Sequence, residues 1–127
     1  MLEDMTPEAA RGLADFLVRE LQQEFATTRK VLAAVPADHC GYKPTERCMS
    51  ALELATHIAI GEAFFLRGVL TGAFEWKAME FQTPEEVAAY YDATIPALIE
   101  QVNALPAENL AQLVTFAVWT QPAVSYL

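Results

Sequence analysis

The chain has 127 residues, 54% of them hydrophobic, and carries seventeen Asp and Glu against eight Lys and Arg, for a net charge of −9. This length is typical of a single domain, and the acidic balance disfavours binding to nucleic acid or to an anionic membrane surface. The chain shows neither a run of about 20 uncharged apolar residues nor a basic, apolar leader, so a cytoplasmic protein is expected.

The first predicted helix covers residues 7–35. Thr6, Pro7 and Glu8 supply an N-cap hydroxyl, a proline at the first helical position and an acid in the first turn, and Pro36 ends the helix. At about 1.5 Å per residue the helix is roughly 43 Å long, which is typical of a helical bundle. Its predicted buried face consists of Leu13, Phe16, Leu17, Leu21, Phe25, Thr28, Leu32 and Val35.

A connection with two prolines and a glycine follows at residues 36–49. Cys40 and Cys48 lie in it at a spacing that matches no zinc motif, and a cytosolic setting favours free thiols. His39 is interpreted as an exposed loop histidine. Tyr42 is expected to pack onto the end of the bundle as a buried anchor.

The second predicted helix, residues 50–71, carries the most informative pattern. Ser50 and Glu53 have the spacing of a capping box, which marks the start of the helix. His57 lies within one turn of an apolar stripe and is expected to point inward, into a gap between long helices. The stripe, which we expect to be buried, consists of Leu54, Ile58, Phe65 and Val69.

Two glycines share the face of His57 on this helix. Gly61 and Gly68 follow it by four and eleven residues, and each costs up to about 1 kcal/mol relative to alanine inside a helix. Either a neighbouring helix packs very close to this strip, or another group occupies the space beside His57.

Residues 73–82 form a second connection, rich in large apolar side chains. Phe74, Trp76, Met79 and Phe81 occur there without helical periodicity. They either cover the open end of the core or form the wall of a ligand pocket.

The third predicted helix starts at Thr83 and Pro84, again with a capping signal, and runs to about Val102 with a kink at Pro96. No alternating apolar pattern predicts a sheet, and residues 110–119 are expected to form an irregular crossing segment. Residues 120–127 have the pattern of the opening of a fourth helix. Because three amphipathic helices bury their stripes poorly without a fourth, we expect the rest of that helix to be missing.

The predicted fold is therefore all-α: an up-down four-helix bundle in a single domain, residues 1–127, with three long helices and only the start of the fourth. Several motifs match one family in particular. These are Arg29-x-Val31-Leu32, Val35-Pro36, Tyr42-Lys43-Pro44, Met49-Ser50-Ala51-Leu52-Glu53-Leu54-Ala55-x-His57-Ile58-Ala59 and Glu62-x-Phe64-Phe65. Together they resemble the DinB/YfiT-like superfamily of small bacterial four-helix bundles, most specifically around Ser50 and His57.

The resemblance implies a chemistry. In such proteins a histidine at the position of His57 commonly joins two histidines on the last helix to bind zinc or nickel, and some relatives use the metal to activate a small thiol. The resemblance thus implies a divalent-metal-dependent enzyme, a thiol-dependent transferase or a hydrolase, with His57 as one metal ligand. A bound thiol would lose its proton to become the nucleophile.

The histidine count leaves a second hypothesis open. The chain contains only His39 and His57, and no pair at four-residue spacing, whereas a catalytic zinc needs about three protein ligands. The alternative is a non-catalytic, stress-associated binding protein whose metal site is incomplete, with His57 as a core histidine. If His57 does bind metal, Glu53 is the expected partner of its second nitrogen, since Glu62 is rotated away. A homodimer is expected in either case.

Overall fold

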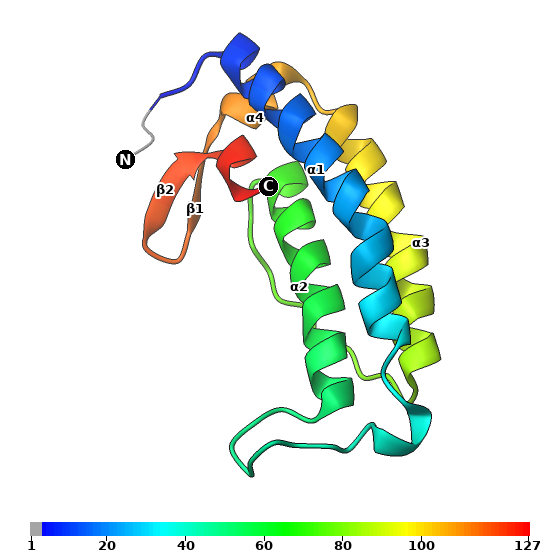
Figure 1. The fold of residues 1–127 in the computed structure, drawn as a ribbon. Coiled ribbons are helices and arrows are strands. Elements are labelled where there is room, and N and C mark those ends of the chain that lie inside the picture. The colour runs from blue at the N-terminus through cyan, green and yellow to red at the C-terminus, as the bar shows by residue number, and fades with distance from the viewer. Residues whose placement is uncertain (1–3) are drawn as a thin grey trace.

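Three long helices form the molecule, a computed structural model that describes residues 4–127; residues 1–3 of the predicted domain lie outside the described part. They are α1 (Pro7–Ala33), α2 (Ala51–Thr71) and α3 (Pro84–Asn103), and they lie side by side (Figure 1). The 3₁₀ turn η1 (Ala37–His39) lies in the first connection. After α3 come the short helix α4 (Ala107–Ala111), the strands β1 (Leu113–Phe116) and β2 (Trp119–Pro122), and the 3₁₀ turn η2 (Ala123–Tyr126).

The helix boundaries follow the predicted capping signals. The Thr6 and Thr83 hydroxyls accept hydrogen bonds from the first turns of α1 and α3, and Ser50 and Glu53 form both hydrogen bonds of a capping box at α2. Gly72 ends α2 in the left-handed conformation, with φ of 78°, which glycine adopts without steric cost. The all-α bundle is confirmed.

The direction of the helices differs from a simple up-down order. α1 and α2 are antiparallel, whereas α2 and α3 run the same way, joined by a connection that returns along α2 (Figure 1). The connection has the length that this path needs. Eleven extended residues, 73–83, span about 36 Å, and a helix of 21 residues such as α2 is about 31 Å long. This return places the connection against the side of α2.

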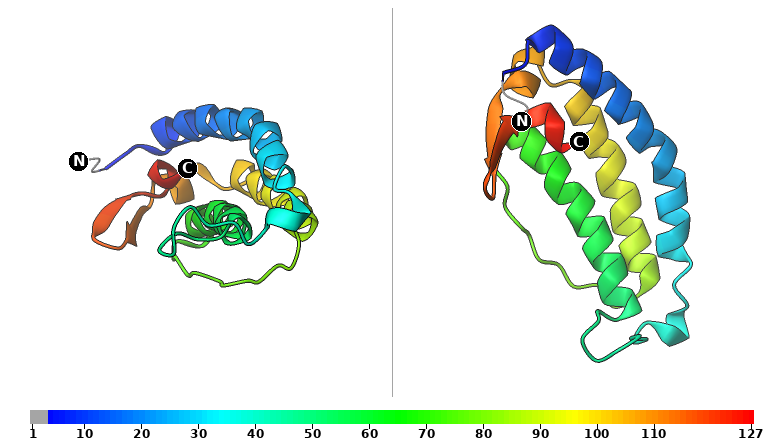
Figure 2. Two further views of the ribbon diagram at one scale, coloured as in Figure 1. Left: turned by 60° about the horizontal axis from the view of Figure 1, so that its bottom comes forward. Right: turned by 60° about the vertical axis from the view of Figure 1, so that its left-hand side comes forward.

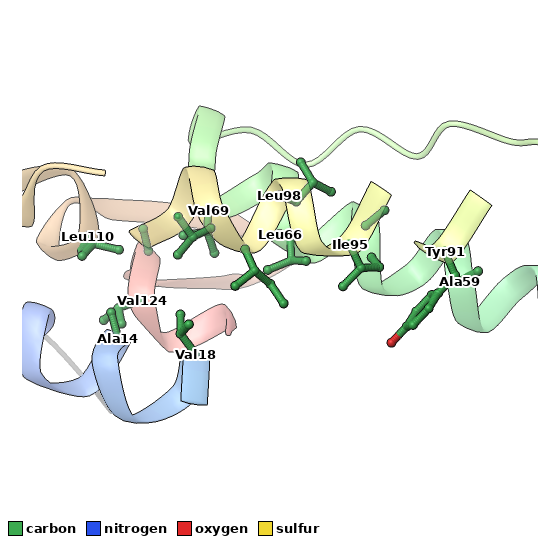
Figure 3. Close-up of a cluster of buried hydrophobic side chains, with 14 of the residues drawn as sticks. Ala14, Val18, Ala59, Leu66, Val69, Tyr91, Ile95, Leu98, Leu110 and Val124 are labelled. Atoms are coloured by element: carbon green, nitrogen blue, oxygen red, sulfur yellow. The ribbon is translucent and has the colours of Figure 1, made fainter. Parts of the chain in front are cut away.

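The core lies between α3 and its two neighbours. α1 and α2 both pack on α3 but make few direct contacts with each other (Figure 2). Tyr91, Ile95, Leu98 and Val102 of α3 are buried along this seam (Figure 3 labels the first three). Among residues 4–127, α2 is the one helix whose length and composition would allow it to cross a membrane, and here it packs in the bundle.

The predicted buried stripe of α2 is wrong. Leu54 is 50% exposed, and Ile58 and Phe65 are each 37% exposed; of the stripe, only Val69 is buried. α2 instead faces the core with three alanines at four-residue spacing, which allow its backbone to approach α3 closely. They are Ala55, Ala59 and Ala63, and Leu66 continues this buried face one turn further on.

The C-terminal segment also differs from its prediction. Residues 113–122 form an antiparallel hairpin in which Phe116 pairs with Trp119, whereas the sequence predicts an irregular segment at residues 110–119 and the opening of a helix from residue 120. The predicted fourth helix begins later and consists of η2 alone. η2 and α4 lie against the first half of α1, where Ala14 and Val18 meet Leu110 and Val124 (Figure 3). The predicted anchor Tyr42 is wrong as well, since it is 63% exposed.

Candidate functional site

His57 lies on the outer side of α2, and the prediction that it points into the bundle is wrong. Its side chain is exposed, because the core face of the helix is turned to the opposite side. The ring is nevertheless covered in part by the returning connection. The Trp76 ring packs against it in a tilted arrangement, with a centroid distance of 5.2 Å and an angle of 35° between the ring planes.

A groove of about 360 Å³ opens beside these two rings, between α2 and the returning connection. Pockets that hold small molecules start at about this volume. The walls are mostly apolar, and a few polar groups converge on the space. The lining residues are Met49, Leu52, Glu53, Thr56, His57, Ile60, Trp76, Ala78, Met79, Glu80, Phe81 and Gln82.

The connection at residues 73–82 both covers the core and forms a pocket wall. Each of the two predicted roles is filled by different apolar residues of this connection. Phe74 packs among Phe64, Phe116 and Tyr126, with ring centroids 4.9–5.4 Å away, and covers the upper end of α2. Trp76, further along the connection, faces the groove with Met79 and Phe81.

Glu53 is not the partner of His57. One carboxylate oxygen accepts a hydrogen bond of 3.0 Å from the Ser50 amide, and the Glu53 amide donates to the Ser50 hydroxyl at 3.1 Å. The hydrogen bond from the Ser50 backbone, then that from its hydroxyl and the nearby charge of Lys43, hold the pKa of Glu53 below its ordinary value. Glu53 therefore presents a negative charge at one end of the groove.

The two glycines of α2 serve different purposes. The ring of Phe74 occupies the space where a Cβ of Gly68 would lie, so this glycine admits the aromatic cluster rather than a ligand. No atom lies within 4 Å of the Cβ position of Gly61. Gly61 thus leaves open space on α2, though it is not among the groove residues.

A second polar cluster, which the sequence did not reveal, lies where the three helices meet. The Tyr91 hydroxyl donates a hydrogen bond of 2.6 Å to Glu62, and the ring of Phe25 stacks on that of Tyr91 at 5.1 Å. Burial raises the pKa of the Glu62 carboxyl, and the hydrogen bond from Tyr91 opposes this only in part. The sequence signal that could have revealed this cluster is the position of Glu62, three residues after Ala59 and therefore on the alanine face of α2.

The first connection holds no assembled site. Cys40 and Cys48 are free thiols, and His39, which is exposed as predicted, lies 2.9 Å from a carboxylate oxygen of Asp38. Across residues 4–127, no three His, Cys, Asp or Glu side chains come close enough together to hold a metal ion.

The sequence profile of the DinB superfamily matches residues 20–127, which include the capping box, His57 and the whole groove. The chain belongs to the DinB superfamily. Searches of curated proteins and of solved structures gave no match.

DinB-superfamily proteins are generally associated with a metal. A catalytic zinc takes about three protein ligands and an open position. His57 is the only histidine on the long helices, while Glu53 is engaged in the capping box and Glu62 with Tyr91. The described part of this DinB-superfamily chain brings no three such ligands together and does not by itself fit a resident metal.

Proposed function

We propose that this DinB-superfamily protein is a binding protein that holds a small organic molecule in the groove beside His57. The observation that supports this is the groove itself: a volume of about 360 Å³ with apolar walls and a few convergent polar side chains. An apolar body would be held by Ile60, Phe81 and the face of Trp76. Thr56 and Gln82 offer hydrogen bonds, and the His57 ring offers a nitrogen that donates or accepts.

Fluorescence of Trp76 is the direct test. The chain has two tryptophans, so Trp119→Phe on β2 leaves Trp76 as the only tryptophan emitter. Three probes share a phenyl ring and differ in charge: phenethylamine, phenethyl alcohol and hydrocinnamate. We expect at least one to change the Trp76 emission saturably, with a dissociation constant at or below about 1 mM, the range of small fragments.

A matched pair of alanines provides the control. Ala78 lines the groove, whereas Ala73 lies in the same connection outside it, and both are exposed. Ala78→Phe should fill the groove and abolish the response, and Ala73→Phe should leave it unchanged. A response that both variants lose equally, or no response to any probe, would refute the proposed binding site.

The second candidate is the metal-dependent enzyme, a thiol-dependent transferase or a hydrolase. Membership of the superfamily and the accessible position of His57 on α2 favour it. The protein is loaded with zinc or nickel and the bound metal is counted by mass spectrometry, with His39→Ala as the control for His57→Ala. Near-stoichiometric metal that only His57→Ala removes would support a metal ligand, and equal loss in both variants would count against it.

We also propose that the protein forms a homodimer. The support is the exposed apolar strip of α2 formed by Leu54, Ile58 and Phe65, because strips of this kind are often covered in an assembly. Light scattering gives the mass. Ile58→Glu should shift a dimer to a monomer, whereas Val118→Glu, on the 87% exposed hairpin tip, should not.

A further inference from the structure

We infer that the groove beside His57 selects an organic cation with an apolar body, such as a protonated aromatic or alkyl amine. The inference rests on the proposed binding function and adds the charge of the ligand to it. Three features support it: the charges around the groove, the exposed aromatic face and the field of the whole protein.

The charges that line the groove are negative. Glu53 and Glu80 contribute carboxylates, and no Lys or Arg is among the described lining residues. After the hydrogen bonds from Ser50, the positive charge of Lys43 also lowers the pKa of Glu53, so it offsets part of the negative charge that Glu53 presents to the groove. Glu80 has no salt-bridge partner among the described residues, and it is the group best placed to attract an ammonium ion.

The aromatic face is of the kind that holds cations. Trp76 lines the groove and is 46% exposed, although burying an indole is strongly favourable. An ammonium group over the face of an indole is attracted by the negative potential of the ring, and tryptophan is the strongest of the aromatic side chains in this respect. Met49 and Met79, 47% and 40% exposed, add polarizable and adaptable walls for the apolar body.

The field of the whole protein acts in the same direction. With a net charge of −9, the protein concentrates small cations near its surface and repels small anions. A carboxylate ligand would meet both this field and the two groove acids, without a lining cation to compensate.

The three phenyl probes test the charge directly, in the Trp119→Phe protein at low salt. We expect phenethylamine to bind more tightly than phenethyl alcohol, and at least about tenfold more tightly than hydrocinnamate. The preference should shrink as salt is added, since the groove is open to solvent.

A second matched pair assigns the effect to the groove. Glu80 lines it and Glu75 does not, although both are exposed acids of the same connection. Glu80→Gln should weaken phenethylamine binding about threefold or more and leave phenethyl alcohol unchanged, whereas Glu75→Gln should have little effect on either.

The outcomes separate the two proposals. Equal affinity for all three probes, a preference for hydrocinnamate, or equal effects of the two glutamine variants would overturn the cation inference while leaving the binding site in place. Failure of every probe to bind would overturn the binding function, and the inference with it.

Discussion

Replacing each of the two α2 glycines with alanine should have opposite effects on stability. Alanine favours a helix over glycine by up to about 1 kcal/mol. At Gly61 the new methyl group meets nothing within 4 Å, so Gly61→Ala should raise the free energy of unfolding by about that amount. At Gly68 the same methyl group would overlap the ring of Phe74.

The cost at Gly68 follows from what Phe74 contacts. Its ring centroid lies 4.9 Å from those of Phe116 and Tyr126, so moving it disturbs the aromatic cluster at the end of the bundle. Overpacking of this kind costs about 1–3 kcal/mol, which outweighs the helix gain. Gly68→Ala should therefore destabilise the protein by about 1–2 kcal/mol, a fall in Tm of roughly 4–8 °C for a chain of this size.

Urea unfolding followed by circular dichroism measures both variants, and a double-mutant cycle with Phe74→Ala isolates the overlap. Once the ring is gone, Gly68→Ala should become stabilising, as Gly61→Ala is. If Gly68→Ala is as stable as Gly61→Ala, or if its penalty persists without the Phe74 ring, the account of this glycine is wrong.

Three further predictions concern polar contacts. Ser50→Ala removes the capping box and should cost about 1 kcal/mol in urea unfolding, and an unchanged midpoint would contradict the role of the cap. Because the pKa of Glu62 is raised in the folded state, the free energy of unfolding should fall as the pH rises from 4.5 through that pKa. Glu62→Gln can still accept the hydrogen bond from Tyr91, so it should be more stable than the parent at pH 7 but not at pH 4, as measured by unfolding at both pH values. Arg29 donates from Nε to both carboxylate oxygens of Asp92 at 2.7 Å, but the pair is half exposed, so Asp92→Asn should cost less than about 1 kcal/mol and the loss should diminish in 1 M salt.

Local signals in the sequence predicted the helix boundaries well. Ser50 with Glu53 and Thr83 with Pro84 each act on backbone groups within a few residues, so the chemistry that starts the helix is visible in a short stretch. The connection at residues 73–82 was also correctly read as a cover or pocket wall.

The faces of α2 could not be predicted in the same way. Leu54 and Ile58 are more hydrophobic than Ala55 and Ala59, so hydrophobic periodicity predicts that the face with Leu54 and Ile58 is buried. The closest helix contact instead favours the smaller side chains, and this depends on α3, which lies far along the chain. The error in turn placed His57 on the inside.

The contact between His57 and Trp76 could not be predicted from the spacing of residues in the sequence. It depends on the connection returning along α2 so that α3 starts at the same end as α2. An up-down order would have sent the connection elsewhere and left His57 without its aromatic neighbour.

α3 is the one long helix that both others need, since α1 and α2 hardly touch each other. Its buried residues include Tyr91, Ile95 and Val102, each with no exposed surface. Either outer helix can fray while the remaining pair stays packed, but opening α3 separates all three at once. Its central amides should therefore exchange with deuterium last, at the rate set by global unfolding, while those of α1 and α2 exchange earlier through partial opening.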